Sequence, residues 1–298
     1  MHPRSTQTPQ IFTVDVEEYF HASAFDRVVA RDTWGQRESR VEPMVDVLLD
    51  MLARTGAFGT FFTLGWLAER RPALVRRIVE AGHEIASHSW WHRRVHTLSA
   101  AEFTDDARRS KDVLEQAAGV RVLGYRAPSF SIVPGTEWAL DALREVGYVY
   151  DSSLFPIRRP GYGYPSAPAR PHMIRCPAGD LFELPLATTT WAGLRLPAAG
   201  GAYLRQLPFG LTRRAFREHA ARGETGVFYT HPWELDPGQP RLPVSWLTRV
   251  RHYRGLERTR DRIAALLAEF RWTSVARAFA LDAARADGGT PAALSRAT

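Results

Sequence analysis

Residues 59–92 read GTFFTLGWLAERRPALVRRIVEAGHEIASHSWWH and contain one complete strand–helix–strand unit. The apolar run Gly59–Leu64 predicts a strand, and Glu84–Ser87 predicts a second one. Between them, Pro72–Ala81 predicts a helix that begins on a proline and stops at Gly82. Two strands joined through a helix are typical of parallel pairing, so this stretch indicates an α/β fold.

The same rhythm continues on both sides of this unit. Ile11–Val16 predicts a strand, and Val41–Thr55 predicts a helix that ends at Gly56. Ser99–Ala118 predicts a helix that opens with a capping box, because Ser99 is followed three residues later by a glutamate. Further elements are expected at Val120–Tyr125, Gly135–Val146, Tyr148–Tyr150, Thr212–Arg222 and Gly226–Thr230. This alternation predicts a largely parallel sheet.

The character of the chain changes after residue 153. Proline and glycine become dense over 154–210, where short strand candidates such as Leu181–Leu184 and Thr188–Trp191 predict an irregular insertion. Two helical stretches, Leu256–Phe270 and Thr273–Ala280, follow Pro240. The expected organisation is a main domain over 10–240 that includes the insertion, a helical extension over 241–285 packed on it, and a flexible tail over 286–298.

Composition excludes several classes of protein. The 298 residues are 45% hydrophobic and 24% charged, as is ordinary for a soluble globular protein of one large or two smaller domains. The net charge of +7 comes from dispersed arginines, with Lys111 the only lysine, so no nucleic-acid partner is expected. The single Cys176 excludes an intrachain disulfide. Because residues 1–10 are polar and no 18-residue apolar run exists, we expect a cytoplasmic protein without a transmembrane segment.

Candidate metal ligands follow two of the predicted strands. His88 and His92 are four residues apart after Glu84–Ser87, a spacing that on a helical turn puts both imidazoles on one face. Asp15 and Glu17 end the first strand, where residues two apart point to the same side. Carboxylate and imidazole together suit a divalent metal with open coordination positions.

Five motifs in order resemble those of the polysaccharide deacetylases, which form carbohydrate esterase family four and share the NodB-homology fold. The motifs are Thr13–Glu17, Ser87–His92, Arg126–Phe130, Tyr150–Ser153 and Tyr229–Trp233. Two downstream stretches, Gly200–Arg205 and His252–Leu256, look like a branch associated with exosortase-type exopolysaccharide loci. The resemblance covers roughly residues 10 to 280. It implies a distorted (β/α) barrel of about seven parallel strands with a C-terminal helical extension.

The resemblance also implies a divalent metal, most often Zn²⁺ with Co²⁺, Ni²⁺ or Mn²⁺ as alternatives, held by His88, His92 and one carboxylate. The commonest family pattern has two adjacent aspartates, but Val16 occupies the second place here. The chain looks instead like the Asp-x-Asp/Glu sub-branch, which includes allantoinase-like members. We therefore assign Asp15 as the general base and Glu17 as the ligand, with Glu18 as the competing ligand.

Other roles follow from the same resemblance. Arg126 matches the arginine that pairs with the base, and His231 matches the general acid. Asp151 matches the aspartate that orients this histidine. Pro128, Phe130, Trp233, Trp91 and His21 are candidates for shaping a sugar cleft, although core packing competes with that interpretation for Trp91 and its neighbour Trp90.

The leading hypothesis is metal-dependent removal of N-acetyl groups from N-acetylhexosamine units of a polysaccharide or of its lipid-linked precursor. A cytoplasmic location, with a peripheral position at the inner membrane as an alternative, favours a lipid-linked or nucleotide-linked intermediate over a finished wall polymer. One alternative is hydrolysis of another non-peptide C–N bond, as in the allantoinase-like relatives. Another is a non-catalytic glycan-binding protein. The oligomeric state is left open.

Overall fold

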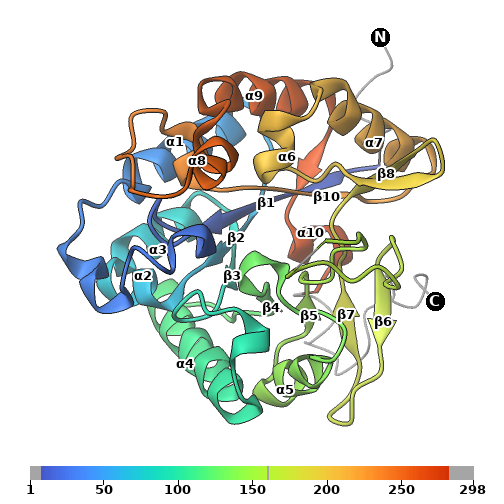
Figure 1. Cartoon of the computed structure of the whole chain (residues 1–298). Helices are drawn as coiled ribbons and strands as arrows, with labels where there is room; N and C mark the ends of the chain where they lie inside the picture. Colours follow the sequence, from blue (N-terminus) through green and yellow to red (C-terminus); the bar gives the residue numbers. More distant parts are fainter. Residues whose placement is uncertain (1–7, 160, 282–298) are drawn as a thin grey trace.

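A curled, mostly parallel sheet forms the centre of the computed structural model, which describes residues 8–159 and 161–281 (Figure 1). Its strands follow the order β10-β1-β2-β3-β4-β5-β7-β6, and β11 also pairs with β1. The strands are β1 (Gln10–Val16), β2 (Thr60–Thr63), β3 (Glu84–Ser87), β4 (Gly124–Tyr125), β5 (Tyr150–Asp151), β6 (His172–Ile174), β7 (Leu181–Glu183), β10 (Val227–Thr230) and β11 (Trp272–Thr273).

The sheet is curled so that its two ends approach each other. The pairs from β10 through β7 are all parallel, whereas β6 runs antiparallel to β7 at the edge. Beyond β7, Leu186 forms a single parallel bridge with Val227, and Gly200 forms another with Tyr229. These bridges link the region after β7 to β10 without a continuous ladder. The expected distorted barrel is thus confirmed as a half-barrel with seven parallel strands in its path.

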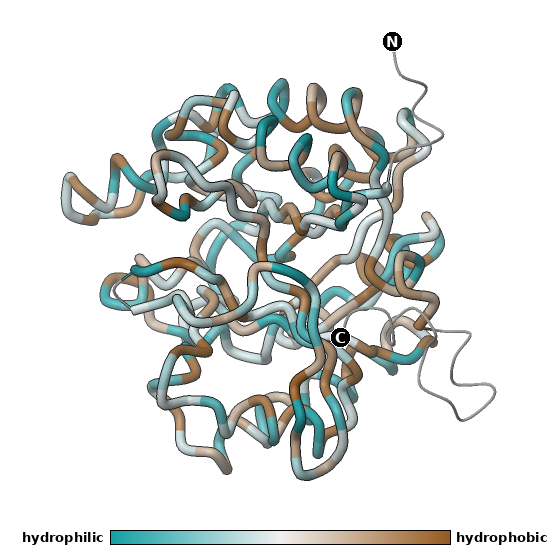
Figure 2. The backbone as a smooth tube through the Cα atoms, turned by 90° about the vertical axis from the view of Figure 1, so that its right-hand side faces the viewer, coloured by the Kyte–Doolittle hydropathy of each residue, from teal (hydrophilic) through white to brown (hydrophobic). Residues whose placement is uncertain are grey.

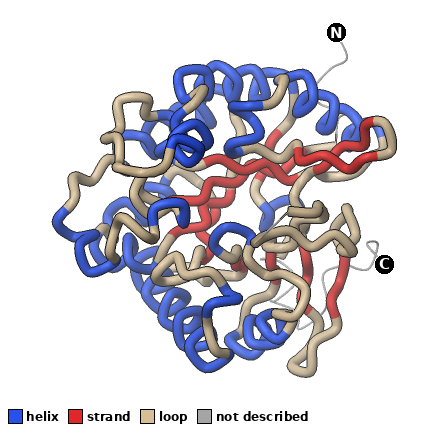
Figure 3. The backbone as a smooth tube through the Cα atoms, in the orientation of Figure 1, coloured by secondary structure: helices blue, strands red, loops and turns tan. Residues whose placement is uncertain are grey.

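Helices cover the outside of the sheet, with α4 and α5 on one side and α7 and α9 on the other (Figures 1 and 3). Hydrophobic and hydrophilic residues alternate along their turns, as in amphipathic helices (Figure 2). The helices are α1 (Val41–Thr55), α2 (Gly65–Arg70), α3 (Pro72–Glu80), α4 (Ala100–Ala118), α5 (Trp138–Val146), α6 (Gly201–Gln206), α7 (Phe209–Ala221), α8 (Trp246–Tyr253), α9 (Thr259–Glu269) and α10 (Val275–Phe279). None of those described is long and apolar enough to cross a membrane.

The predicted helix ends are confirmed where local chemistry fixes them. Helix α1 ends at Gly56, whose φ of 63° lies in the left-handed region that glycine adopts without strain. At the start of α4, the Ser99 hydroxyl accepts a hydrogen bond from the Glu102 backbone, and the Glu102 carboxylate accepts one from the Ser99 backbone. This reciprocal pair is the predicted capping box.

The C-terminal region contributes directly to the sheet. The predicted helix Thr273–Ala280 begins two residues late, because Trp272 and Thr273 pair as β11 with Gln10 and Ile11 of β1. The 154–210 region contains the hairpin of β8 (Thr188–Trp191) and β9 (Leu194–Pro197), together with α6. The tail predicted over 286–298 lies outside the described residues.

Candidate metal centre and catalytic site

Several predicted site residues lie at the carboxyl edge of the sheet. Glu17 directly follows β1, His88 follows β3, Arg126 follows β4 and His231 follows β10, while Asp151 ends β5. Because these strands are parallel, their carboxyl ends meet at one edge, where residues distant in sequence converge.

The two histidines are brought together by a loop rather than by the expected helical turn. Ser89 and His92 have φ angles of 66° and 51°, so the backbone leaves the helical region twice within five residues. The Asp106 carboxylate holds this loop by accepting hydrogen bonds from the Trp90 and Trp91 backbone at 2.8 and 3.3 Å. As a result, the imidazole ring centroids of His88 and His92 lie 5.2 Å apart.

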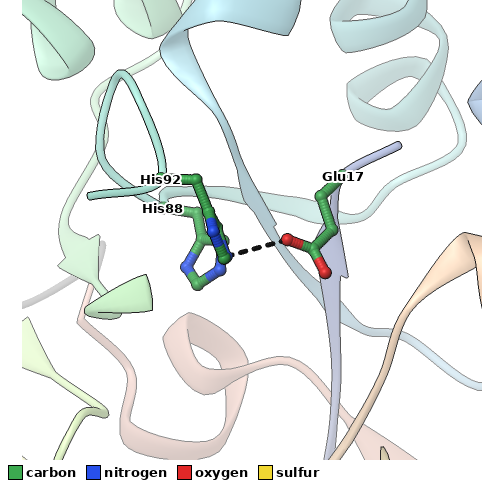
Figure 4. Close-up of side chains that lie close together, drawn as sticks. All are labelled: Glu17, His88 and His92. Carbon is green, nitrogen blue, oxygen red and sulfur yellow. Dashed lines mark ion pairs between the residues drawn. The ribbon is translucent and has the colours of Figure 1, made fainter. Parts of the chain in front are cut away.

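Glu17 completes a buried group with these histidines (Figure 4). One potential ligand atom from each of the three residues lies within 4.8 Å of the other two. Glu17 Oε2 is 2.9 Å from His92 Nε2, and His88 Nδ1 donates to the Arg126 carbonyl at 2.8 Å, which leaves His88 Nε2 for a ligand. Among the described residues, this is the group of histidine, cysteine and carboxylate side chains close enough to share a metal.

The donor set fits a divalent cation. Glu17 Oε2 is buried, has no hydrogen-bond partner among the described residues and lies 2.9 Å from His92 Nε2. Burial would raise the pKa of Glu17, but the neighbouring His92 and His231 hold it well below its ordinary value, so the carboxylate is ionised. Burial lowers the pKa of His88 to about 4, so its imidazole is neutral. An ionised carboxylate and a neutral imidazole are the protonation states in which these groups bind a metal.

Glu18, the competing ligand, points elsewhere. Its carboxylate accepts hydrogen bonds from the Ser39 hydroxyl and from the Arg40 backbone, the latter at 3.0 Å. The alternation of side chains along an extended backbone explains the difference between neighbouring glutamates. Glu17 is therefore the glutamate that the structure places with the histidines.

Asp15 and Arg126 form a buried ion pair beside the metal-ligand candidates. Arg126 is fully buried, and its Nη1 lies 2.7 Å from Asp15 Oδ1. The guanidinium also donates to the Thr13 hydroxyl and to the carbonyl and hydroxyl of Ser152. These contacts fix Asp15 Oδ1 and leave Oδ2 directed toward His231 Nε2 at 3.9 Å.

His231 is surrounded by carboxylates. Its Nε2 lies 3.6 Å from Glu17 Oε1, and its Nδ1 donates to Glu234 Oε2 at 3.1 Å. Burial alone would lower the pKa of His231, but the charges of Glu17, Glu234 and Asp15 outweigh burial and raise it to about 9. The imidazole can therefore carry a proton at neutral pH on a nitrogen that faces the site.

The expected orienting role of Asp151 is wrong. Asp151 accepts hydrogen bonds from the Ser153 backbone and hydroxyl, and no hydrogen bond or ion pair among the described residues joins it to His231. Asp151 ends β5, which does not pair with β10, whereas Glu234 is three residues after His231. This spacing is the signal that the sequence analysis missed. His231 precedes the helical turn Pro232–Leu235, and a glutamate three residues after such an N-cap residue indicates a capping box.

Asp151 instead forms a buried carboxyl pair with Glu183, its partner in the register of β5 and β7. Burial raises the pKa of Asp151 to about 6 and that of Glu183 well above its ordinary value. Two carboxyls in such proximity cannot both ionise without a large cost. The pair therefore retains a proton at acidic pH.

We expect the free energy of unfolding of Glu183→Gln to increase relative to that of the wild type as pH rises. The folded-state pKa values of both carboxyls exceed the unfolded ones, so the pair contributes most below about pH 4 and loses this contribution as pH passes about 6. Each unit of pKa shift corresponds to about 1.4 kcal/mol. Denaturant unfolding at several pH values measures the difference between the two proteins, and parallel profiles would contradict the shared proton.

The candidate substrate-binding residues are mostly buried. Trp233 Nε1 donates to Glu17 Oε1 at 2.9 Å, and the Phe130 ring packs on Tyr229 at 4.9 Å. His21 is 1% exposed and lies against Trp34 and Trp66, and its expected place at the sugar cleft stays a prediction. Its aromatic neighbours draw the ring into the core. Pro128 is buried as well, and partly exposed Trp91 packs against Trp34.

Two family models match adjacent parts of the chain. Residues 25–150 match polysaccharide deacetylase, and residues 152–280 match a domain of unknown function (DUF3473). The chain is 30% identical over 95 residues to a peptidoglycan-N-acetylglucosamine deacetylase of Bacillus cereus, which covers 32% of this chain and 34% of that protein. It is 31% identical over 81 residues to a peptidoglycan-N-acetylmuramic acid deacetylase of Bacillus subtilis, with 27% and 17% covered. The matches thus span about a third or less of these relatives.

A solved structure matches nearly the whole fold. It comes from Mycobacterium smegmatis, is assigned as a polysaccharide deacetylase and superposes with a TM-score of 0.61. The match covers 96% of this chain and 94% of the other at 22% sequence identity, so the likeness concerns the fold. The deacetylase model includes His88, His92 and Arg126, whereas Asp15 and Glu17 precede it.

Proposed function

Because the chain carries a polysaccharide deacetylase domain followed by a C-terminal DUF3473 extension, we propose that it removes N-acetyl groups from N-acetylhexosamine units. The observation that carries the proposal is the buried group of Glu17, His88 and His92 next to the Asp15–Arg126 ion pair and His231. The substrate class that we propose is an exopolysaccharide or its lipid-linked precursor. The named relatives act on peptidoglycan, which supports an N-acetylated glycan in general.

In this proposal, Glu17, His88 and His92 hold a divalent metal, with zinc the first candidate. The metal supplies polarisation of the acetamide carbonyl and of a water molecule. Asp15 Oδ2 accepts the proton of the attacking water, since Arg126 occupies Oδ1 and keeps the carboxylate oriented. His231 Nε2 then donates a proton to the departing amine nitrogen.

The test combines metal analysis with acetate release. We expect one divalent metal per chain and acetate release from at least one member of a panel of N-acetylated glycans, which includes peptidoglycan fragments and lipid-linked N-acetylhexosamines. Chelation should abolish the release, and added metal should restore it. Metal-loaded protein that binds a glycan without releasing acetate would instead indicate a binding protein.

The general-acid role predicts that His231→Ala separates two kinds of substrate. An amine leaves poorly without a proton, so deacetylation of acetamides should fall about 10²–10⁴-fold, the usual contribution of acid–base catalysis. An aryl acetate has a good leaving group, so its hydrolysis should change much less. Metal content should stay at the wild-type level. Equal losses on both substrates would identify His231 as a substrate-positioning residue instead.

A further inference from the structure

Two buried side chains connect His231 to helices α6 and α8 within the DUF3473 region, residues 152–280. We propose that Arg205 and Glu234 form a positioning arm that fixes the His231 ring toward the metal-ligand candidates, so that the DUF3473 region is part of the catalytic site. This inference rests on the proposed deacetylase function. It assigns Arg205 as a positioning residue, because its guanidinium acts through Glu234.

Arg205 is the anchor of the arm. It is 3% exposed, and its Nε donates to Glu234 Oε1 at 2.6 Å. Its Nη1 donates to the carbonyls of His252 and Arg254, each at 2.8 Å. A buried charge is stable only when its donors are satisfied, and the planar guanidinium meets the carboxylate and the carbonyls at the same time. An ammonium group at this position could not reproduce the fork.

Glu234 transmits this anchoring to the histidine. Oε2 accepts hydrogen bonds from the His231 backbone and from His231 Nδ1, both at 3.1 Å, and from the Thr230 hydroxyl at 3.2 Å. Oε1 is held by Arg205, so neither oxygen is free to rotate away. With Nδ1 fixed, the opposite nitrogen of the ring faces Asp15 and Glu17.

Stacked aromatic rings also hold the His231 imidazole in this position. Trp233 lies between His231 and His252, with centroid distances of 4.8 and 4.2 Å and interplanar angles of 20° and 18°. The Trp233 indole also donates to Glu17. His252 in turn contacts the Gln239 side-chain oxygen through Nε2 at 3.0 Å. The DUF3473 region thus contains the proposed acid and contacts a proposed metal ligand through Trp233.

The arm is assembled from three segments that all lie within residues 152–280. Arg205 comes from α6, the carbonyls come from the end of α8 and the residue after it, and Glu234 comes from the short turn Pro232–Leu235. Gly255 allows their close approach, because it has a φ of 80° and a Cβ there would lie 2.9 Å from the Arg205 carbonyl oxygen. Packing around Arg205 therefore organises the extension against the site.

The test is Arg205→Ala, with Arg213→Ala as the matched control, since Arg213 pairs with Glu269 on the partly exposed side of α7. We expect Arg205→Ala to lower acetamide deacetylation about 10–100-fold, the range typical for partners that orient functional side chains. Aryl acetate hydrolysis and metal content should stay near wild type. Added guanidinium ion should restore part of the deacetylation, because it can occupy the space of the missing group. Arg205→Lys and Glu234→Gln provide folded alternatives if the alanine variant is unstable.

A second readout is independent of turnover. In protein labelled with ¹⁵N-histidine, the hydrogen-bonded Nδ1 proton of His231 should give a signal that is absent in His231→Ala and lost or shifted in Arg205→Ala. An unchanged signal in Arg205→Ala and Arg205→Lys, or equal losses on amide and ester without guanidinium rescue, would overturn the arm. Wild-type protein that hydrolyses neither substrate would refute the proposed function, while the signal would still decide whether the arm positions the ring.

Discussion

Replacement of His88 by alanine is expected to remove the bound metal and to abolish hydrolysis of acetamides and aryl acetates alike. His88 Nε2 is one of three buried ligand candidates, and its Nδ1 is already committed to the Arg126 carbonyl. With only Glu17 and His92 left, two ligands remain where catalytic zinc sites use three from the protein. Metal analysis of the purified variant and both activity assays measure the effect directly.

His96→Ala is the matched control, because this exposed histidine lies four residues after His92 on the same connection. It should keep the metal and both activities. The contrast with His231→Ala is diagnostic, since that variant should lose amide hydrolysis while it keeps the metal. If His88→Ala retained wild-type metal content, the ligand assignment would fail, whatever happened to the rate.

The sequence pattern predicts those elements whose signals are local. Helices α1 and α4 were predicted almost to the residue because apolar periodicity coincides with a left-handed glycine in one case and a capping box in the other. Strands β4 and β5 are only two residues long, shorter than the runs from which they were predicted. Helix α8 was not predicted, because eight residues that contain two arginines give no long apolar stripe.

For the site, strand order brings together residues that no local pattern relates. The family motifs placed Glu17, His88 and Arg126 correctly at strand ends, since parallel strands share a carboxyl edge. The helical turn predicted between the histidines is wrong, because the structure has a loop there. Asp106 from α4 accepts a hydrogen bond from the backbone of this loop, and such a tertiary contact cannot be predicted from spacing. The partner of His231 was misassigned for a different reason, because the local spacing of His231 and Glu234 was not recognised as a capping box.

Asp15→Asn is expected to lower turnover about 10²–10⁴-fold, the usual cost of removing a general base. The amide oxygen of asparagine can still accept the Arg126 hydrogen bond that Asp15 Oδ1 accepts. The other terminal atom becomes an NH₂ group, which cannot take a proton from water. Metal content should therefore remain near wild type while both amide and ester hydrolysis fall, because each reaction needs an activated water.

This pattern distinguishes the base from the other two classes of residue, since His231→Ala should spare the ester and His88→Ala should lose the metal. Glu18→Gln is the matched control, because Glu18 is a nearby buried carboxyl bonded to Ser39 and to the Arg40 backbone, and burial raises its pKa.

Arg126 keeps its bonds to Thr13 and Ser152 in Asp15→Asn, so the variant should fold, although removing the counter-charge of a buried guanidinium lowers its stability. Thermal unfolding must show that the protein is folded at the assay temperature. A folded, metal-loaded Asp15→Asn protein with wild-type turnover would show that another group accepts the proton, since no other change in the variant compensates for the lost carboxylate.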